Sequence, residues 1–142
     1  MTDLDRVAFK RAIVLRLDGV AEEHRLGHQD AYANRYKMKS ADDAPIELMF
    51  EKGAEQLANL WMLAEYVAPL LDRSIAFELS PKSRLYTVPA KNGGMQYGRH
   101  SALEDMMQLG RADLVRFDLA SMAELDRILA TLSQEKRKGG VR

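Results

Sequence analysis

The chain has 142 residues, of which 46% are hydrophobic and 30% are charged, and its 21 basic residues balance its 21 acidic residues. These totals predict one globular domain with a core of its own, and they exclude the strongly basic composition that marks many nucleic-acid-binding proteins. The chain has no cysteine, which excludes disulfides and thiolate zinc sites. Without a recognisable signal peptide or membrane-spanning run, the sequence predicts a cytoplasmic protein with no membrane association.

The N-terminal segment is predicted to form a helix that reaches to about Leu26. Thr2 or Asp3 can cap its first turn by accepting hydrogen bonds from backbone amides. The run 12–17 is apolar enough to be a buried strand instead, so that alternative stays open. The residues that follow a helical spacing, and that predict the apolar face, are Leu4, Val7, Ala8, Ala12 and Leu15.

The middle of the chain is predicted to contain two helices separated by a strand. Residues 28–39 are interpreted as a mostly polar helix. Alternating apolar and polar residues over 46–53 predict a strand that ends in a turn at Gly53. Apolar residues three and four positions apart over 54–71 predict a helix ending near Pro69. A strand within 59–67 is the alternative for that last segment.

Two further strands are predicted over 74–80 and 84–90, joined by a turn whose residues are proline, lysine and serine. A second turn follows at Asn92, because an asparagine followed by glycine is a strong turn signal. A short helix over 101–110 comes next. Ser101 and Glu104 have the spacing of a capping box at its start.

The C-terminal segment is predicted to be a strand over 113–120 followed by a helix over 121–136. Ser121 and Glu124 again have capping-box spacing. The basic run 136–142 is predicted to be a flexible tail. The apolar stripe of the helix consists of Leu125, Ile128, Leu129 and Leu132.

This order of elements lacks a regular alternation of strand and helix, which favours the α+β class. The sequence therefore predicts a single α+β domain over 1–135, with a small, mostly antiparallel sheet and about four to five helices.

The candidate functional surface lies between Leu79 and Leu103, a stretch that contains no acidic residue. Cations bind phosphates and aromatic rings can stack on unpaired bases, so this composition suits a nucleic acid or another phosphate-bearing ligand. A turn followed by an ordinary capped helix is the alternative interpretation of 91–104. The predicted binding residues are Lys82, Arg84, Tyr86, Lys91, Tyr97, Arg99 and Ser101.

His100 is the candidate catalytic residue if the protein is an enzyme. An imidazole there could act as general acid or base in a nuclease-like phosphodiesterase, with Arg99 or Lys82 stabilising developing charge. Metal-dependent nuclease chemistry is disfavoured because Glu78 and Lys82 are too far apart in sequence for the usual motif. His24 and His28 are interpreted as solvated side chains, and no metal site or cofactor motif is predicted.

The alternative function is a non-enzymatic interaction module or homo-oligomeric adaptor. Met106 and Met107 are adjacent, so they cannot both face one core stripe of a helix. One of them is expected at the surface or in a contact with a partner, which offers some support for a homodimer.

Overall fold

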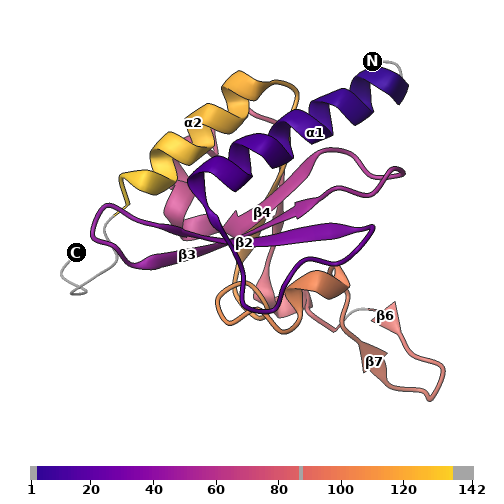
Figure 1. Ribbon diagram of the computed structural model, residues 1–142. Coiled ribbons are helices and arrows are strands. Elements are labelled where there is room, and N and C mark those ends of the chain that lie inside the picture. Colours follow the sequence, from indigo (N-terminus) through magenta and orange to yellow (C-terminus); the bar gives the residue numbers. More distant parts are fainter. Residues whose placement is uncertain (1–2, 87, 136–142) are drawn as a thin grey trace.

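The computed structural model describes residues 3–86 and 88–135, and in these ranges the chain forms a six-stranded antiparallel sheet with two α-helices side by side on one face (Figure 1). The helices are α1 (Asp3–Val20) and α2 (Met122–Ser133). The sheet consists of β1 (Glu22–Glu23), β2 (Ala33–Lys39), β3 (Pro45–Glu51), β4 (Asn59–Leu63), β8 (Leu114–Asp118) and β5 (Phe77–Ser80), in that spatial order.

Shorter elements connect these strands. Three 3-10 helices cover Ala64–Leu70, Lys82–Arg84 and Ser101–Leu103 in the described part of the chain. A separate hairpin pairs β6 (Val88–Pro89) with β7 (Met95–Gln96), and it projects away from the sheet (Figure 1). No helix among the described residues is long and apolar enough to cross a membrane.

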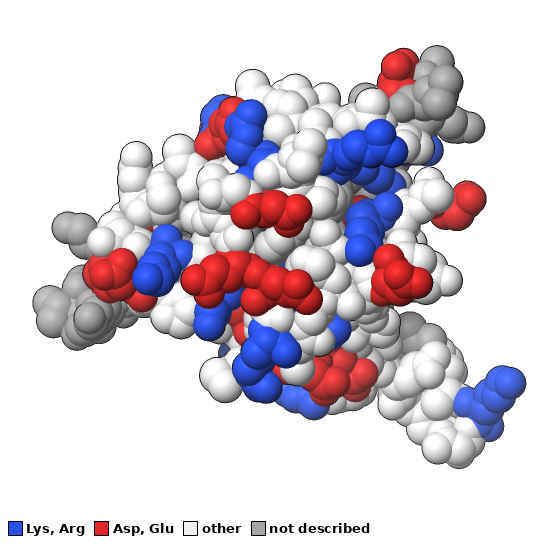
Figure 2. Space-filling model, viewed as in Figure 1, with Lys and Arg blue, Asp and Glu red and all other residues white. Residues whose placement is uncertain are grey.

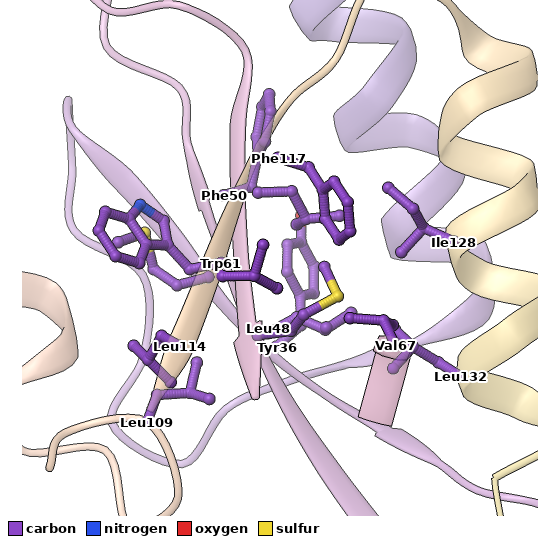
Figure 3. Packing of buried hydrophobic residues seen from close by; sticks show 14 of the residues in the cluster. Tyr36, Leu48, Phe50, Trp61, Val67, Leu109, Leu114, Phe117, Ile128 and Leu132 are labelled. Atoms are coloured by element: carbon purple, nitrogen blue, oxygen red, sulfur yellow. The ribbon is translucent and has the colours of Figure 1, made fainter. Parts of the chain in front are cut away.

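Buried hydrophobic residues lie on both faces of the sheet (Figure 3). Phe50 and Phe117 lie on the face that packs against Ile128 of α2. Trp61 and Leu109 lie on the opposite side of the strands, where a segment of turns with one 3-10 helix after β7 covers the sheet. The α+β class and the antiparallel sheet are therefore confirmed.

Several predicted elements are confirmed. The run 12–17 belongs to α1, so the helix interpretation is right, and β3 and β8 occupy the predicted strands. The hydroxyl of Ser121 accepts a hydrogen bond from the Glu124 amide at 3.2 Å, which confirms the cap of α2. All four residues of its predicted apolar stripe are buried: Leu125, Ile128, Leu129 and Leu132.

The length and orientation of α1 differ from the prediction. The helix ends at Val20 instead of continuing to about Leu26, and a two-residue strand follows. Its core face carries the fully buried Ile13 and Leu17. Residues Val7 and Leu15, predicted to face the core, are exposed. The error arose because α1 has apolar residues on more than one face, so spacing alone selected the wrong stripe.

Residues 28–39 do not form a helix, because 33–39 is strand β2. Tyr36 and Met38 are buried on the helix-facing side, while Lys37 and Lys39 are exposed. This alternation with a period of two is the strand pattern, and it is present in the sequence.

The predicted helix over 54–71 is also wrong, and the alternative strand is right for its first part. Strand β4 pairs with β3 and β8 and is buried on both faces. A strand buried on both faces has no apolar–polar alternation to identify it. The helical spacing noticed there came from Trp61 in the strand and Val67 in the following 3-10 helix.

The predicted helix over 101–110 is reduced to the 3-10 helix Ser101–Leu103, capped by His100 rather than by Ser101. The expected four to five helices are therefore not found: the described residues contain two α-helices, and their other helical segments are short 3-10 turns.

The predicted strands 74–80 and 84–90 are found only in part, as β5 and the two-residue β6, and residues 82–84 form a 3-10 helix; β5 pairs with β8, and β6 pairs with β7. The turn at Asn92 is confirmed: the Gly94 amide donates to the Asn92 side chain at 3.1 Å, and Gly93 has a φ of 90°. The proposed tail 136–142 lies outside the described residues.

Candidate anion-binding site

The structure places Arg99 in an internal clamp. Its guanidinium donates to the Ser80 hydroxyl at 2.8 Å and to the Ser80 and Ala112 carbonyls, each at 2.6 Å. It also contacts the carbonyls of Leu109 and Gly110 at 3.3 and 3.5 Å. These bonds join β5 to the segment that precedes β8, so Arg99 holds the covering segment against the sheet.

His100 and Tyr97 also make contacts within the protein. His100 Nδ1 accepts a hydrogen bond from the Ala102 amide at 3.1 Å, which caps the 3-10 helix. Burial lowers the pKa of His100, with a further decrease from Arg35 and an opposing increase from Glu51. The Tyr97 hydroxyl donates to the Gly110 carbonyl at 2.7 Å, and burial raises its pKa.

Other predicted binding residues lie in separate local settings. Lys82 and Arg84 are exposed on their 3-10 helix, and Lys91 is exposed in the turn between β6 and β7. The Tyr86 hydroxyl accepts from Arg111 at 2.8 Å. The Ser101 hydroxyl accepts from the Gln29 side chain at 3.2 Å.

The Arg99 guanidinium is directed inward to protein carbonyls, whereas Lys91 lies in the turn of the projecting hairpin, so these two cations are in different settings. The predicted surface stays a prediction, and the catalytic role of His100 stays one too.

The buried acids of β3 have structural partners. The Glu47 carboxylate accepts from the amides of Met107, Gln108 and Leu109 at 2.7 to 3.2 Å, and it lies 2.6 Å from His24 Nε2. Glu51 accepts from the Trp61 indole at 2.7 Å. Buried carboxylates need such partners, so these contacts account for their burial.

The two histidines interpreted as solvated are engaged with the protein, and His24 is buried. His24 Nδ1 accepts from the Leu26 amide at 3.1 Å, and His28 Nδ1 accepts from the Arg35 amide at 3.0 Å. Within 3–86 and 88–135, no three His, Cys, Asp or Glu side chains form a group that could hold a metal ion.

A concentration of positive charge lies elsewhere, in a hollow between α1 and the connection from β3 to β4. We call it the basic hollow. It has a volume of about 560 Å³, and its lining residues are Arg6, Val7, Lys10, Arg11, Val14, Lys52, Ala54 and Glu55. Four basic side chains and one acidic side chain therefore surround one concavity.

Helical spacing explains the α1 wall of the basic hollow. Arg6 and Lys10 are four residues apart, as are Val7 and Arg11, so each pair lies on neighbouring turns of one helix face. Lys52 is supplied by the connection that leaves β3. Two elements distant in sequence thus contribute cations to the same concavity.

Lys10 fixes the two walls of the basic hollow to one another. The side chain is buried, and its ammonium donates to the carbonyls of Gly53 and Gln56 in the β3–β4 connection. Burial lowers the pKa of Lys10, and nearby Arg6 lowers it further, whereas Glu51 raises it. An anion in the hollow would favour the charged form of this lysine.

The face of the molecule seen in Figure 2 has separate basic and acidic regions. Basic side chains gather near the N-terminal half of α1, and acidic side chains form a band across the middle of the same view. The Arg16–Asp126 ion pair and the His24–Glu47 contact lie outside the basic hollow.

A larger hollow of about 830 Å³ lies between the C-terminal ends of α1 and α2 and the β2–β3 hairpin. Its charged lining residues are Glu22, Lys37, Lys39 and Asp43, so the two signs balance. This hollow therefore offers no preference for an anion.

Sequence reasoning missed the basic hollow because it weighed only capping and apolar spacing in the first helix. The signal was present as Arg6, Lys10 and Arg11, whose spacing places cations on one side of a helix. The contribution of Lys52 depends on how the β3–β4 connection packs, which a one-dimensional pattern does not contain.

Comparison with known proteins adds no relative: no family model, curated protein or solved structure matches this chain.

Proposed function

We propose that the protein binds a phosphate-bearing ligand and that the contact is made in the basic hollow rather than by segment 79–104. The observation that carries this proposal is the convergence of four basic side chains, from α1 and from the β3–β4 connection, on one concavity. Hydrogen bonds between cationic side chains and phosphate oxygens are stronger than those between neutral groups. In a concave site, water also screens the attraction between these cations and a bound anion less than it does on an open surface.

Calorimetric titration with inorganic pyrophosphate tests this proposal. The double variant Arg6→Ala/Arg11→Ala should weaken binding by at least about tenfold, since the loss of even one charge-assisted contact is worth roughly 1.5 kcal/mol or more. Binding should also weaken as salt is added.

The double variant Lys82→Ala/Arg84→Ala is the matched control, because it removes the same charge from exposed positions of the surface that the sequence predicted. It should bind pyrophosphate as the natural chain does. If this control loses binding while Arg6→Ala/Arg11→Ala retains it, the 79–104 surface is the site and the basic hollow is not.

One observation favours the second candidate function, an interaction module or homo-oligomer. Met107 is 82% exposed, whereas Met106 beside it is buried, so a large apolar side chain is presented to solvent. Leu15 on α1 is 68% exposed as well. Size-exclusion chromatography with light scattering at micromolar concentration tests this function: a dimer that Met107→Ser dissociates supports it, and a monomer with no binding partner opposes it.

A further inference from the structure

The basic hollow has an apolar wall as well as cations. Val7 and Val14 are seven residues apart on α1, and Ala54 of the β3–β4 connection belongs to the same lining. Val7 is about half exposed, at 49%. Inorganic phosphate has no group that would bury this surface, whereas an organic phosphate ester does.

The basic region is small, and this limits the shape of the ligand. In Figure 2 the basic side chains near α1 give way to a band of acidic side chains across the same face. Exposed acids of the chain include Asp18 near the C-terminal end of α1, and Glu22 and Glu23 of β1. A long polyanion lying across this face would meet like charge, while a compact ligand confined to the hollow would not.

Charge and size agree with a compact ligand. The four basic residues and the one acidic residue of its lining give the hollow a formal charge of +3. A nucleoside diphosphate carries a charge of about −3 near neutral pH, because its last phosphate proton leaves near pH 6. The volume of about 560 Å³ lies in the range of ordinary small-molecule sites.

From these observations we infer that the ligand of the basic hollow is a compact organic phosphate of the nucleoside diphosphate class. The phosphates contact Arg6, Arg11 and Lys52, and the organic group covers Val7 and Val14. Lys10 is a positioning residue in this arrangement, because its ammonium holds the β3–β4 connection against α1. This inference rests on the proposed function.

The experiment compares three probes on the full chain by calorimetry: inorganic pyrophosphate, ADP and a twelve-nucleotide oligothymidylate. ADP should bind at least about tenfold more tightly than pyrophosphate, because its organic group buries apolar surface that pyrophosphate leaves open. The oligonucleotide should bind more weakly than ADP.

Variants of exposed residues separate the two contributions. Val7→Ser should weaken the binding of ADP at least threefold and leave the affinity for pyrophosphate unchanged. Leu15→Ser is the matched control, since it alters an exposed apolar residue of α1 that does not line the basic hollow. It should change the affinity for neither probe.

The outcomes distinguish the inference from the function on which it rests. Equal affinities for ADP and pyrophosphate overturn the inference and leave phosphate binding intact. Tighter binding of the oligonucleotide, lost in Arg6→Ala/Arg11→Ala, also overturns it and identifies a nucleic acid as the partner. No binding of any probe overturns both.

Discussion

At the scale of single residues, several conspicuous polar side chains of this chain stabilise its own backbone. Arg99 is the clearest case, because its guanidinium contacts four carbonyls and one hydroxyl on two separate segments. Its position in a glycine-rich basic loop suggested a ligand contact. The sequence shows that an arginine is present, but it does not show which hydrogen-bond acceptors lie near its side chain in the folded protein.

The Arg99→Ala substitution should destabilise the protein by about 2–4 kcal/mol, because it removes hydrogen bonds to a charged group and leaves partly buried carbonyls without a donor. Urea unfolding followed by tryptophan fluorescence measures the effect. Arg84→Ala is the control and should change stability by no more than about 0.5 kcal/mol, since Arg84 is exposed. An equally small change in the free energy of unfolding for Arg99→Ala would show that the Arg99 contacts do not stabilise the fold.

The lowered pKa of His100 predicts a dependence of stability on pH. Its folded-state pKa lies below the ordinary value of about 6.5, so the unfolded chain binds this proton more readily. Stability should therefore fall as pH decreases from about 7 through 6.5 and below. His100→Gln should reduce this decrease when urea unfolding is compared between pH 7.5 and pH 5.5. If the stability of the variant falls as steeply with pH, or more steeply, burial of His100 does not cause the pH dependence.

At the scale of elements, the sequence predicted α2, β3 and β8, but it missed β4 and also β2, although β2 has a period-two pattern of burial. Helix α2 has a narrow stripe and a side-chain cap, so its start and its core face followed from pattern alone, although it ends at Ser133 and not at 136. Strand β4 has buried residues throughout, so its period was hidden. Helix α1 was recognised as a helix, but its several apolar faces concealed which one packs on the sheet.

In the segment after Leu103, tertiary contacts prevent the helix that the local sequence pattern predicts. It resembles a helix in sequence, yet the amides of Met107, Gln108 and Leu109 donate to the Glu47 carboxylate of β3. Amides used in this way are not available for bonds within a helix. The partner that decides the conformation is about 60 residues away, which explains why local reasoning failed.

Glu47→Gln should loosen this segment, because an amide oxygen replaces a charged acceptor and the bond to His24 is weakened. Amide exchange at 107–109 should accelerate, and stability should fall by about 1.5–3 kcal/mol. Glu104→Gln changes an exposed acid close to the same segment and should affect neither quantity. Unchanged exchange in Glu47→Gln would show that other contacts hold the segment.

At the scale of the whole molecule, zero net charge conceals a local separation of charge. The chain has equal numbers of basic and acidic residues, yet four cations converge on the basic hollow and acids form a band nearby (Figure 2). The expectation of a phosphate-bearing ligand came from the sequence. The place proposed for it came from packing, because Lys52 joins the α1 cations only after β3 and α1 are brought together.

The most direct test of this account is an amide chemical-shift titration of the ¹⁵N-labelled chain with inorganic pyrophosphate. Binding in the basic hollow predicts saturable shifts that are largest at residues 6–14 and 52–56, and that disappear in Arg6→Ala/Arg11→Ala. Shifts concentrated at residues 82–101, or no saturable shifts at all, would contradict it.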